Sequence, residues 1–139
     1  DADLEYDPND FVPMLRRIEE GATVVYGSRI LGENEMSHLS FYLGGRLLSV
    51  LANLLYGTRI TDEPTCYKMV RREVIAGLDL RSEGFEFCPE VTAKLARRGH
   101  RIVEVPIRYA PRKLHEGKKI RFRDGLIAVS TLFRYRLWR

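Results

Sequence analysis

The spacing of hydrophobic residues changes along the first third of the chain. Phe11, Leu15 and Ile18 recur at helical spacing, after a polar stretch that offers capping residues and before a glycine. This pattern predicts a short helix that ends at the glycine. The apolar run at 23–26 predicts a buried strand that breaks into a loop at Gly27.

The segment 38–56 is strongly apolar and carries a single charge, Arg46. Its polar residues Arg46, Ser49 and Asn53 stand at i, i+3 and i+7, so they share one face of a helix. A transmembrane helix needs about 20 mostly apolar residues, and the two glycines before the central arginine argue against one. We expect a helix that is buried or that lies in a membrane interface.

Helices and short strands alternate through the rest of the chain. A polar loop and a short extended piece lead into a helix that begins near Arg71, and Pro89 is expected at the first position of the next helix. Alternating apolar residues at 102–107 predict a strand. The last helix is expected to follow a basic loop and to be capped by Asp124. This order of elements predicts an α/β layered domain.

The chain's 139 residues suit one domain or part of one, and a hydrophobic content of 45% excludes a disordered chain.

The charge of the chain is distributed unevenly. Residues 1–36 carry nine acids against three bases, whereas residues 112–139 carry nine bases against two acids. Cys66 and Cys88 match no metal spacing or disulfide framework, and free thiols suit a reducing cytoplasmic setting.

The first residues of the chain contain an Asp-x-Asp motif. In an extended segment Asp1 and Asp3 point to the same side and repel each other unless a cation lies between them. A calcium loop of the EF-hand type is excluded, because Tyr6 and Val12 occupy its glycine and glutamate positions. Mg²⁺ or Mn²⁺ completed by substrate phosphates remains, with an exposed acidic terminus as the alternative.

Four segments in order resemble the family 2 glycosyltransferases: DADLEYDP, VVYGSR, TDEPTCYKMVRREV and the stretch that starts at EVPIRY. The similarity is strongest to dolichol-phosphate mannose synthases and related polyprenyl-phosphate sugar transferases, and it covers nearly the whole chain. It implies a three-layer α/β fold of the GT-A (Rossmann-like, nucleotide-diphospho-sugar transferase) type. Residues 1–139 would be the C-terminal part of the catalytic domain, and a nucleotide-binding half of roughly ninety residues would precede the motif.

The resemblance implies a set of donor-binding residues. Asp1 and Asp3 would hold Mg²⁺ or Mn²⁺ against the nucleotide diphosphate, and Glu5 could complete the metal shell. Arg29 would face the diphosphate or the sugar, with a surface arginine as the alternative. The residues that would close over the donor phosphates are Arg112, Lys118 and Lys119. The sequence EGKKI lacks the serine that relatives often carry beside the lysines, which weakens the role of Lys118.

The resemblance also implies two residues on the acceptor side. Arg46 would contact the acceptor phosphate, and a structural ion pair is the alternative because a charge on an apolar helix needs a partner. Asp62 matches an aspartate that relatives carry near the acceptor. A phosphate acceptor is already largely anionic at neutral pH, so we assign Asp62 to positioning the acceptor or sugar, with base catalysis second and a turn-forming aspartate as the alternative.

The implied reaction is an inverting displacement from a nucleotide sugar to a lipid-linked phosphate, and the chain alone is expected to be inactive. A lipid-linked acceptor implies that the protein would lie at the cytoplasmic face of a membrane. The segment 125–139 could form a membrane-interface helix, because it combines Leu126, Phe133, Leu137 and Trp138 with three arginines.

Two other function classes stay open. The basic run near residue 120 would suit a nucleic-acid-binding module, but Phe122 is the one aromatic residue among those bases, so nucleic acid is not the expected partner. The other alternative is a non-catalytic interaction domain.

Overall fold

The computed structural model describes residues 5–35, 38–111 and 122–137. Within them a three-stranded sheet has the order β2-β1-β3. The central strand β1 (Val24–Ser28) pairs in parallel with β3 (Ile102–Pro106) and antiparallel with β2 (Lys68–Val70). The helical elements are the 3-10 helix η1 (Pro8–Asp10), α1 (Phe11–Glu19), α2 (Leu39–Tyr56), α3 (Arg72–Ala76), α4 (Phe87–Arg97) and α5 (Phe122–Leu137).

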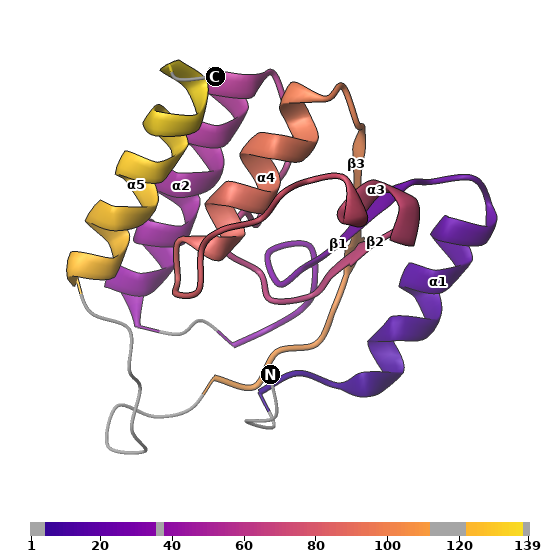
Figure 1. Ribbon diagram of the computed structural model, residues 1–139. Helices are drawn as coiled ribbons and strands as arrows, with labels where there is room; N and C mark the ends of the chain where they lie inside the picture. Colours follow the sequence, from indigo (N-terminus) through magenta and orange to yellow (C-terminus); the bar gives the residue numbers. More distant parts are fainter. Residues whose placement is uncertain (1–4, 36–37, 112–121, 138–139) are drawn as a thin grey trace.

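The elements form three layers, with α1 on one face of the sheet and α2, α4 and α5 on the other (Figure 1). Side chains of a strand alternate between its faces, so β1 contributes to two cores. Val25 packs with Met14 of α1, whereas Val24 and Tyr26 join the cluster that includes Leu95 of α4. The predicted α/β layering is confirmed for the described residues.

Gly27 lies inside β1, and the prediction that the strand breaks there was wrong. β1 continues to Ser28, and Gly27 pairs with Val105 of β3. A Cβ atom on Gly27 would lie 2.7 Å from Cγ2 of Ile107. The glycine therefore marks a close approach between chain segments, a role that glycine often has in strands.

Two expected helix starts are shifted. α4 begins at Phe87, so Pro89 occupies its third position, where the missing N–H has no intrahelical partner to lose. Asp124 lies in the first turn of α5 and does not precede the helix. The end of α4 is as predicted, because Gly99 follows it with a φ of +77°, a left-handed conformation that favours glycine.

α2 turns its polar side inward and leaves an apolar stripe exposed. Its buried residues are Ser49 and Ala52. The stripe residues are 46% to 77% exposed: Leu39, Leu43, Leu47, Val50 and Leu54. α2 is long and apolar enough to cross a membrane, but core helices of soluble proteins can have the same length and composition.

The carboxyl ends of β1 and β3 meet at one edge of the sheet. The loop after β1 bonds there to the residues that follow β3, and the loop after α2 joins them. Ligands of α/β folds bind at the carboxyl ends of parallel strands. This edge is where the candidate site lies.

Candidate active site

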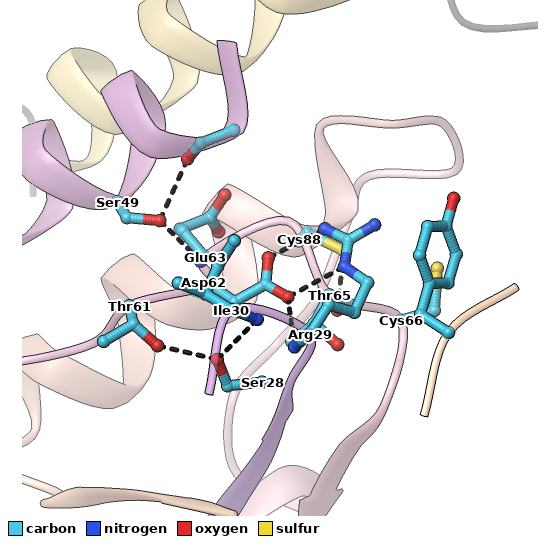
Figure 2. A network of polar contacts seen from close by, with 12 residues as sticks. Ser28, Arg29, Ile30, Ser49, Thr61, Asp62, Glu63, Thr65, Cys66 and Cys88 are labelled. Atoms are coloured by element: carbon cyan, nitrogen blue, oxygen red, sulfur yellow. Dashed lines mark hydrogen bonds and ion pairs between the residues drawn. The ribbon is translucent and has the colours of Figure 1, made fainter. Parts of the chain in front are cut away.

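The centre of this edge is an ion pair between Arg29 and Asp62 (Figure 2). Nε and Nη2 of Arg29 donate to the two carboxylate oxygens at 2.8 and 2.7 Å, and the backbone N–H of Arg29 adds a third bond of 2.9 Å. Asp62 is 2% exposed. Burial alone would lower the pKa of Arg29, but hydrogen bonds and charge from Asp62 raise it, so the guanidinium stays charged.

The loop that carries Arg29 is fixed on the end of β3. The side chain of Asn34 donates to the carbonyl oxygens of Arg29 and Ile107, and its own oxygen accepts the N–H of Tyr109. A Cβ atom on Gly32 would lie 2.3 Å from the Ile107 carbonyl oxygen, so only glycine fits this approach. The Arg29 guanidinium lies 5.0 Å from the centre of the Tyr109 ring.

The polar face of α2 holds the segment that carries Asp62. Asn53 exchanges two hydrogen bonds with the backbone of Ile60, and Ser49 accepts the N–H of Glu63. Arg46 donates to the Thr61 carbonyl oxygen at 3.0 Å, so its described partner is a carbonyl and not a carboxylate. The prediction that Arg46, Ser49 and Asn53 share one face of the helix is confirmed. This face forms hydrogen bonds with the backbone of residues 60–63.

Glu63, next to Asp62, is fully buried. One carboxylate oxygen accepts the Thr92 hydroxyl, and the other has no hydrogen-bond partner within the described residues. Burial raises the pKa of Glu63, and the nearby Lys68 amine offsets part of that rise. Burial therefore makes Glu63 easier to protonate than a carboxyl group in water.

A cavity of about 690 Å³ lies beside Tyr109 and has an acidic lining. The carboxylates that line it belong to Glu5, Asp7, Glu33 and Glu35. Arg108 also lines it, but pairs with Asp7 and Asp10. The Tyr109 hydroxyl donates to Glu5 at 3.1 Å, so Tyr109 links the cavity to Arg29.

The described residues bring four predicted site residues into one region. Arg29 and Asp62 pair directly, Arg46 binds the residue before Asp62, and Glu5 is linked through Tyr109. The described residues contain no group of three or more His, Cys, Asp or Glu placed to hold a metal. The other predicted residues lie outside the described ranges: Asp1, Asp3, Arg112, Lys118 and Lys119.

Sequence reasoning missed three residues that shape the site. Glu104 of β3 accepts hydrogen bonds from Thr61 and Asp62, and Tyr109 packs on Arg29. Glu104 had a signal in the sequence, since it is an acid in a strand of apolar residues. Thr61 and Tyr109 had none, because hydroxyl and aromatic residues are common in loops.

Comparison with known proteins places this geometry in context. No family model matches the chain. It is 31% identical over 90% of its length to the low-salt glycan biosynthesis hexosyltransferase Agl6 of Haloferax volcanii, and 31% identical over 85% to the undecaprenyl-phosphate mannosyltransferase of Micrococcus luteus. It is 26% identical over 97% to the dolichol-phosphate mannosyltransferase of Pyrococcus furiosus. The chain is a relative of polyprenyl-phosphate sugar transferases.

The resemblance inferred from the four sequence segments is therefore confirmed. The chain spans 31% to 50% of the length of these three transferases. The similarity covers the elements that carry Arg29, Arg46 and Asp62, because it extends over most of this chain.

Proposed function

We propose that this chain contributes to an inverting hexosyltransferase that moves a sugar from a nucleotide sugar to a polyprenyl (dolichyl-type) phosphate. The observation that carries the proposal is the convergence of Arg29, Arg46 and Asp62 at the carboxyl-end edge of the sheet. Its support is the similarity to transferases named for polyprenyl-phosphate acceptors. The chain would form the C-terminal part of a GT-A catalytic domain.

In the proposed reaction, a phosphate oxygen of the acceptor attacks the anomeric carbon while the bond to the nucleoside diphosphate breaks. Arg46 would bind the acceptor phosphate, since guanidinium groups bind phosphate in a bidentate manner. Asp62 would position the acceptor or sugar. A base role for Asp62 is the weaker choice, because Arg29 already occupies both of its oxygens and a phosphate acceptor has little need of a base.

On the donor side, Arg29 would stabilise the charge of the leaving diphosphate together with Arg112, Lys118 and Lys119. A divalent cation would also serve this side. The described lining of the cavity at Glu5 is rich in carboxylates, which would repel a bare diphosphate. Mg²⁺ or Mn²⁺ held by Asp1, Asp3 and Glu5 would neutralise that charge and stabilise the leaving group.

The exposed apolar stripe of α2 supports a peripheral position on a membrane. α5 adds four exposed apolar residues: Phe122, Leu126, Phe133 and Leu137. Its last turn contains Arg134 and Arg136, which would bind anionic headgroups at the cytoplasmic face. This arrangement would bring the site to a lipid-linked acceptor.

The test is transfer of labelled hexose by the protein at its natural length. Nucleotide hexoses would be supplied with Mn²⁺ and polyprenyl phosphate, and polyprenol without phosphate would serve as the control acceptor. Transfer is expected only to the phosphate. Arg46→Ala should raise the KM for the acceptor roughly ten- to hundredfold, because a charge-assisted contact contributes about 1.5–3 kcal/mol.

Arg59→Ala is the matched control, because Arg59 is exposed in the loop after α2. Transfer to polyprenol as fast as to its phosphate, or equal effects of the two arginine variants, would refute the assigned acceptor site. No transfer from any nucleotide hexose would refute the proposed activity.

A further inference from the structure

One carboxylate of β3 faces the segment that carries Asp62. Glu104 lies in the middle of the strand, opposite Tyr26 of β1. Ile102, two residues earlier, packs against the core that contains α4 and α5 residues, so Glu104 points to the same side of the sheet. A carboxylate on that side needs hydrogen-bond donors to offset the loss of water.

Glu104 accepts hydrogen bonds from three donors. The N–H of Thr61 lies 2.9 and 2.8 Å from its two oxygens, the Thr61 hydroxyl donates at 2.9 Å, and the N–H of Asp62 donates at 3.1 Å. An ionised carboxylate only accepts hydrogen bonds. Glu104 therefore fixes the backbone that leads directly into Asp62.

The same carboxylate also acts on the loop of Arg29. Because the Thr61 hydroxyl donates to Glu104, its oxygen is free to accept the hydroxyl of Ser28, 2.7 Å away (Figure 2). The Ser28 oxygen then accepts the N–H groups of Ile30 and Leu31, both at 3.2 Å. The direction of this hydroxyl chain follows from the donation of the Thr61 hydroxyl to Glu104.

We infer that Glu104 is a positioning residue for the Arg29–Asp62 pair. It holds Asp62 through the backbone, and it holds the Arg29 loop through the hydroxyls of Thr61 and Ser28. The inference rests on the proposed function, in which that pair serves sugar transfer. Both members of the pair thus depend on one side chain from a different strand.

Two sets of variants in the natural-length protein separate these connections. Glu104→Gln keeps the size of the side chain, but an amide nitrogen cannot accept an N–H. Thr61→Val removes the hydroxyl that links Glu104 to Ser28 but keeps the bonds from the N–H groups of Thr61 and Asp62 to Glu104, and Thr61→Ser retains that hydroxyl. We expect Glu104→Gln to lower kcat about ten- to hundredfold, because misplacement by about 1 Å has effects of that size, with a smaller change in KM.

Thr61→Val should lower kcat less than Glu104→Gln, and Thr61→Ser should restore it. Glu73→Gln is the control, because Glu73 is an exposed acid on α3, and kcat should not change.

The deciding comparison repeats Glu104→Gln in an Asp62→Asn background. If Glu104 acts through the pair, Glu104→Gln should lower kcat less than threefold in that background. If the two residues act independently, their separate losses of kcat should multiply. Multiplicative losses, or no loss of kcat in Glu104→Gln, would overturn the inference.

Amide hydrogen exchange tests the positioning without any assay of transfer. In Thr61→Val, exchange at Ile30 and Leu31 should rise about tenfold while Asp62 keeps its protection; in Glu104→Gln all three should rise. These patterns would support the inference even if no sugar were transferred, a result that would count against the proposed function alone. Unchanged exchange in both variants would refute the positioning role.

Discussion

At the scale of single residues, the bonds of Asp62 limit what it can do. Its two oxygens already accept three hydrogen bonds from Arg29. A carboxylate offers about four acceptor positions, so little capacity remains. One further hydrogen bond from a sugar hydroxyl fits this capacity, which is why we assign Asp62 to positioning.

Unlike Asp62, the neighbouring Glu63 has a carboxylate oxygen with no hydrogen-bond partner within the described residues. It gives a prediction for stability. Burial raises its pKa in the folded protein above the ordinary 4.5, so the folded state retains a proton that the unfolded state loses. Its contribution to the free energy of unfolding is therefore full below pH 4.5 and falls as the pH rises through the folded pKa. Glu63→Gln should remove this part of the pH dependence.

The measurement is denaturant unfolding of wild type and Glu63→Gln between pH 4.5 and 8. Glu83→Gln is the control, because Glu83 is exposed. The same pH dependence in wild type and Glu63→Gln would show that Glu63 does not titrate on unfolding.

At the scale of elements, a substitution at Gly27 tests whether the close approach of β1 to the end of β3 excludes a side chain. A Cβ atom would meet the side chain of Ile107 at 2.7 Å and Cβ of Tyr67 at 3.0 Å. Gly27→Ala should lower the free energy of unfolding by about 1–3 kcal/mol, the usual cost of overpacking. Gly125→Ala in α5 meets open space, so it should raise stability by up to about 1 kcal/mol.

Thermal or denaturant unfolding of the two alanine variants provides the comparison. Equal effects of Gly27→Ala and Gly125→Ala would show that the close approach at β1 carries no steric constraint.

The junction of α4 and α5 gives a second prediction at this scale. Glu90 of α4 is buried and binds Lys94, the N–H of Ser82 and the hydroxyl of Tyr135 in α5. Burial alone would raise the pKa of Glu90, but these hydrogen bonds lower it to about 2. Its stabilisation is therefore present above pH 4.5 and is lost as the pH falls toward 2.

Glu90→Gln should lower the free energy of unfolding at pH 7 by about 2–3 kcal/mol. The difference from wild type should shrink at pH 3. A difference that is independent of pH would mean that packing alone, and not the charge of Glu90, connects the two helices.

Most elements could be predicted because their signals are local. The helical spacing of Phe11, Leu15 and Ile18 predicted α1, and Gly99 marked the end of α4. The misreading of Gly27 has a physical cause. A glycine that breaks a strand and one that admits a neighbouring chain look the same in sequence, and the neighbour here is Ile107, far along the chain.

At the scale of the whole molecule, the exposed apolar side chains of α2 and α5 predict membrane binding. Large exposed apolar patches mark interaction sites. The protein should float with vesicles that contain anionic lipid, and binding should weaken with salt because Arg134 and Arg136 contribute through charge. Leu43→Gln combined with Leu47→Gln should reduce flotation strongly.

Ile75→Gln is the control for flotation, since Ile75 is exposed on α3, away from the stripe. If the folded protein stays with the soluble fraction at low salt, or if Ile75→Gln has the same effect as the leucine variants, α2 does not contact lipid.

The candidate site could be predicted only as separate residues. The resemblance gave Arg29 and Asp62 roles on the donor and acceptor sides, but no pattern in the sequence indicated that they bind each other. The contact of Glu104 with Thr61 was equally invisible, because it joins segments that are brought together by the sheet. The domain boundaries and the metal site stay predictions.

The parallel pairing of β1 with β3 has a consequence for the order of synthesis. Val24 pairs with Ile102, so β1 leaves the ribosome well before its partner has been made. At roughly 5–20 residues per second, several seconds pass in between. During that time β1 can pair only with β2 among these strands, and Glu104 has not yet been translated. The nascent chain must keep an apolar strand from wrong partners until then, which makes this interval the one in which a chaperone would matter most.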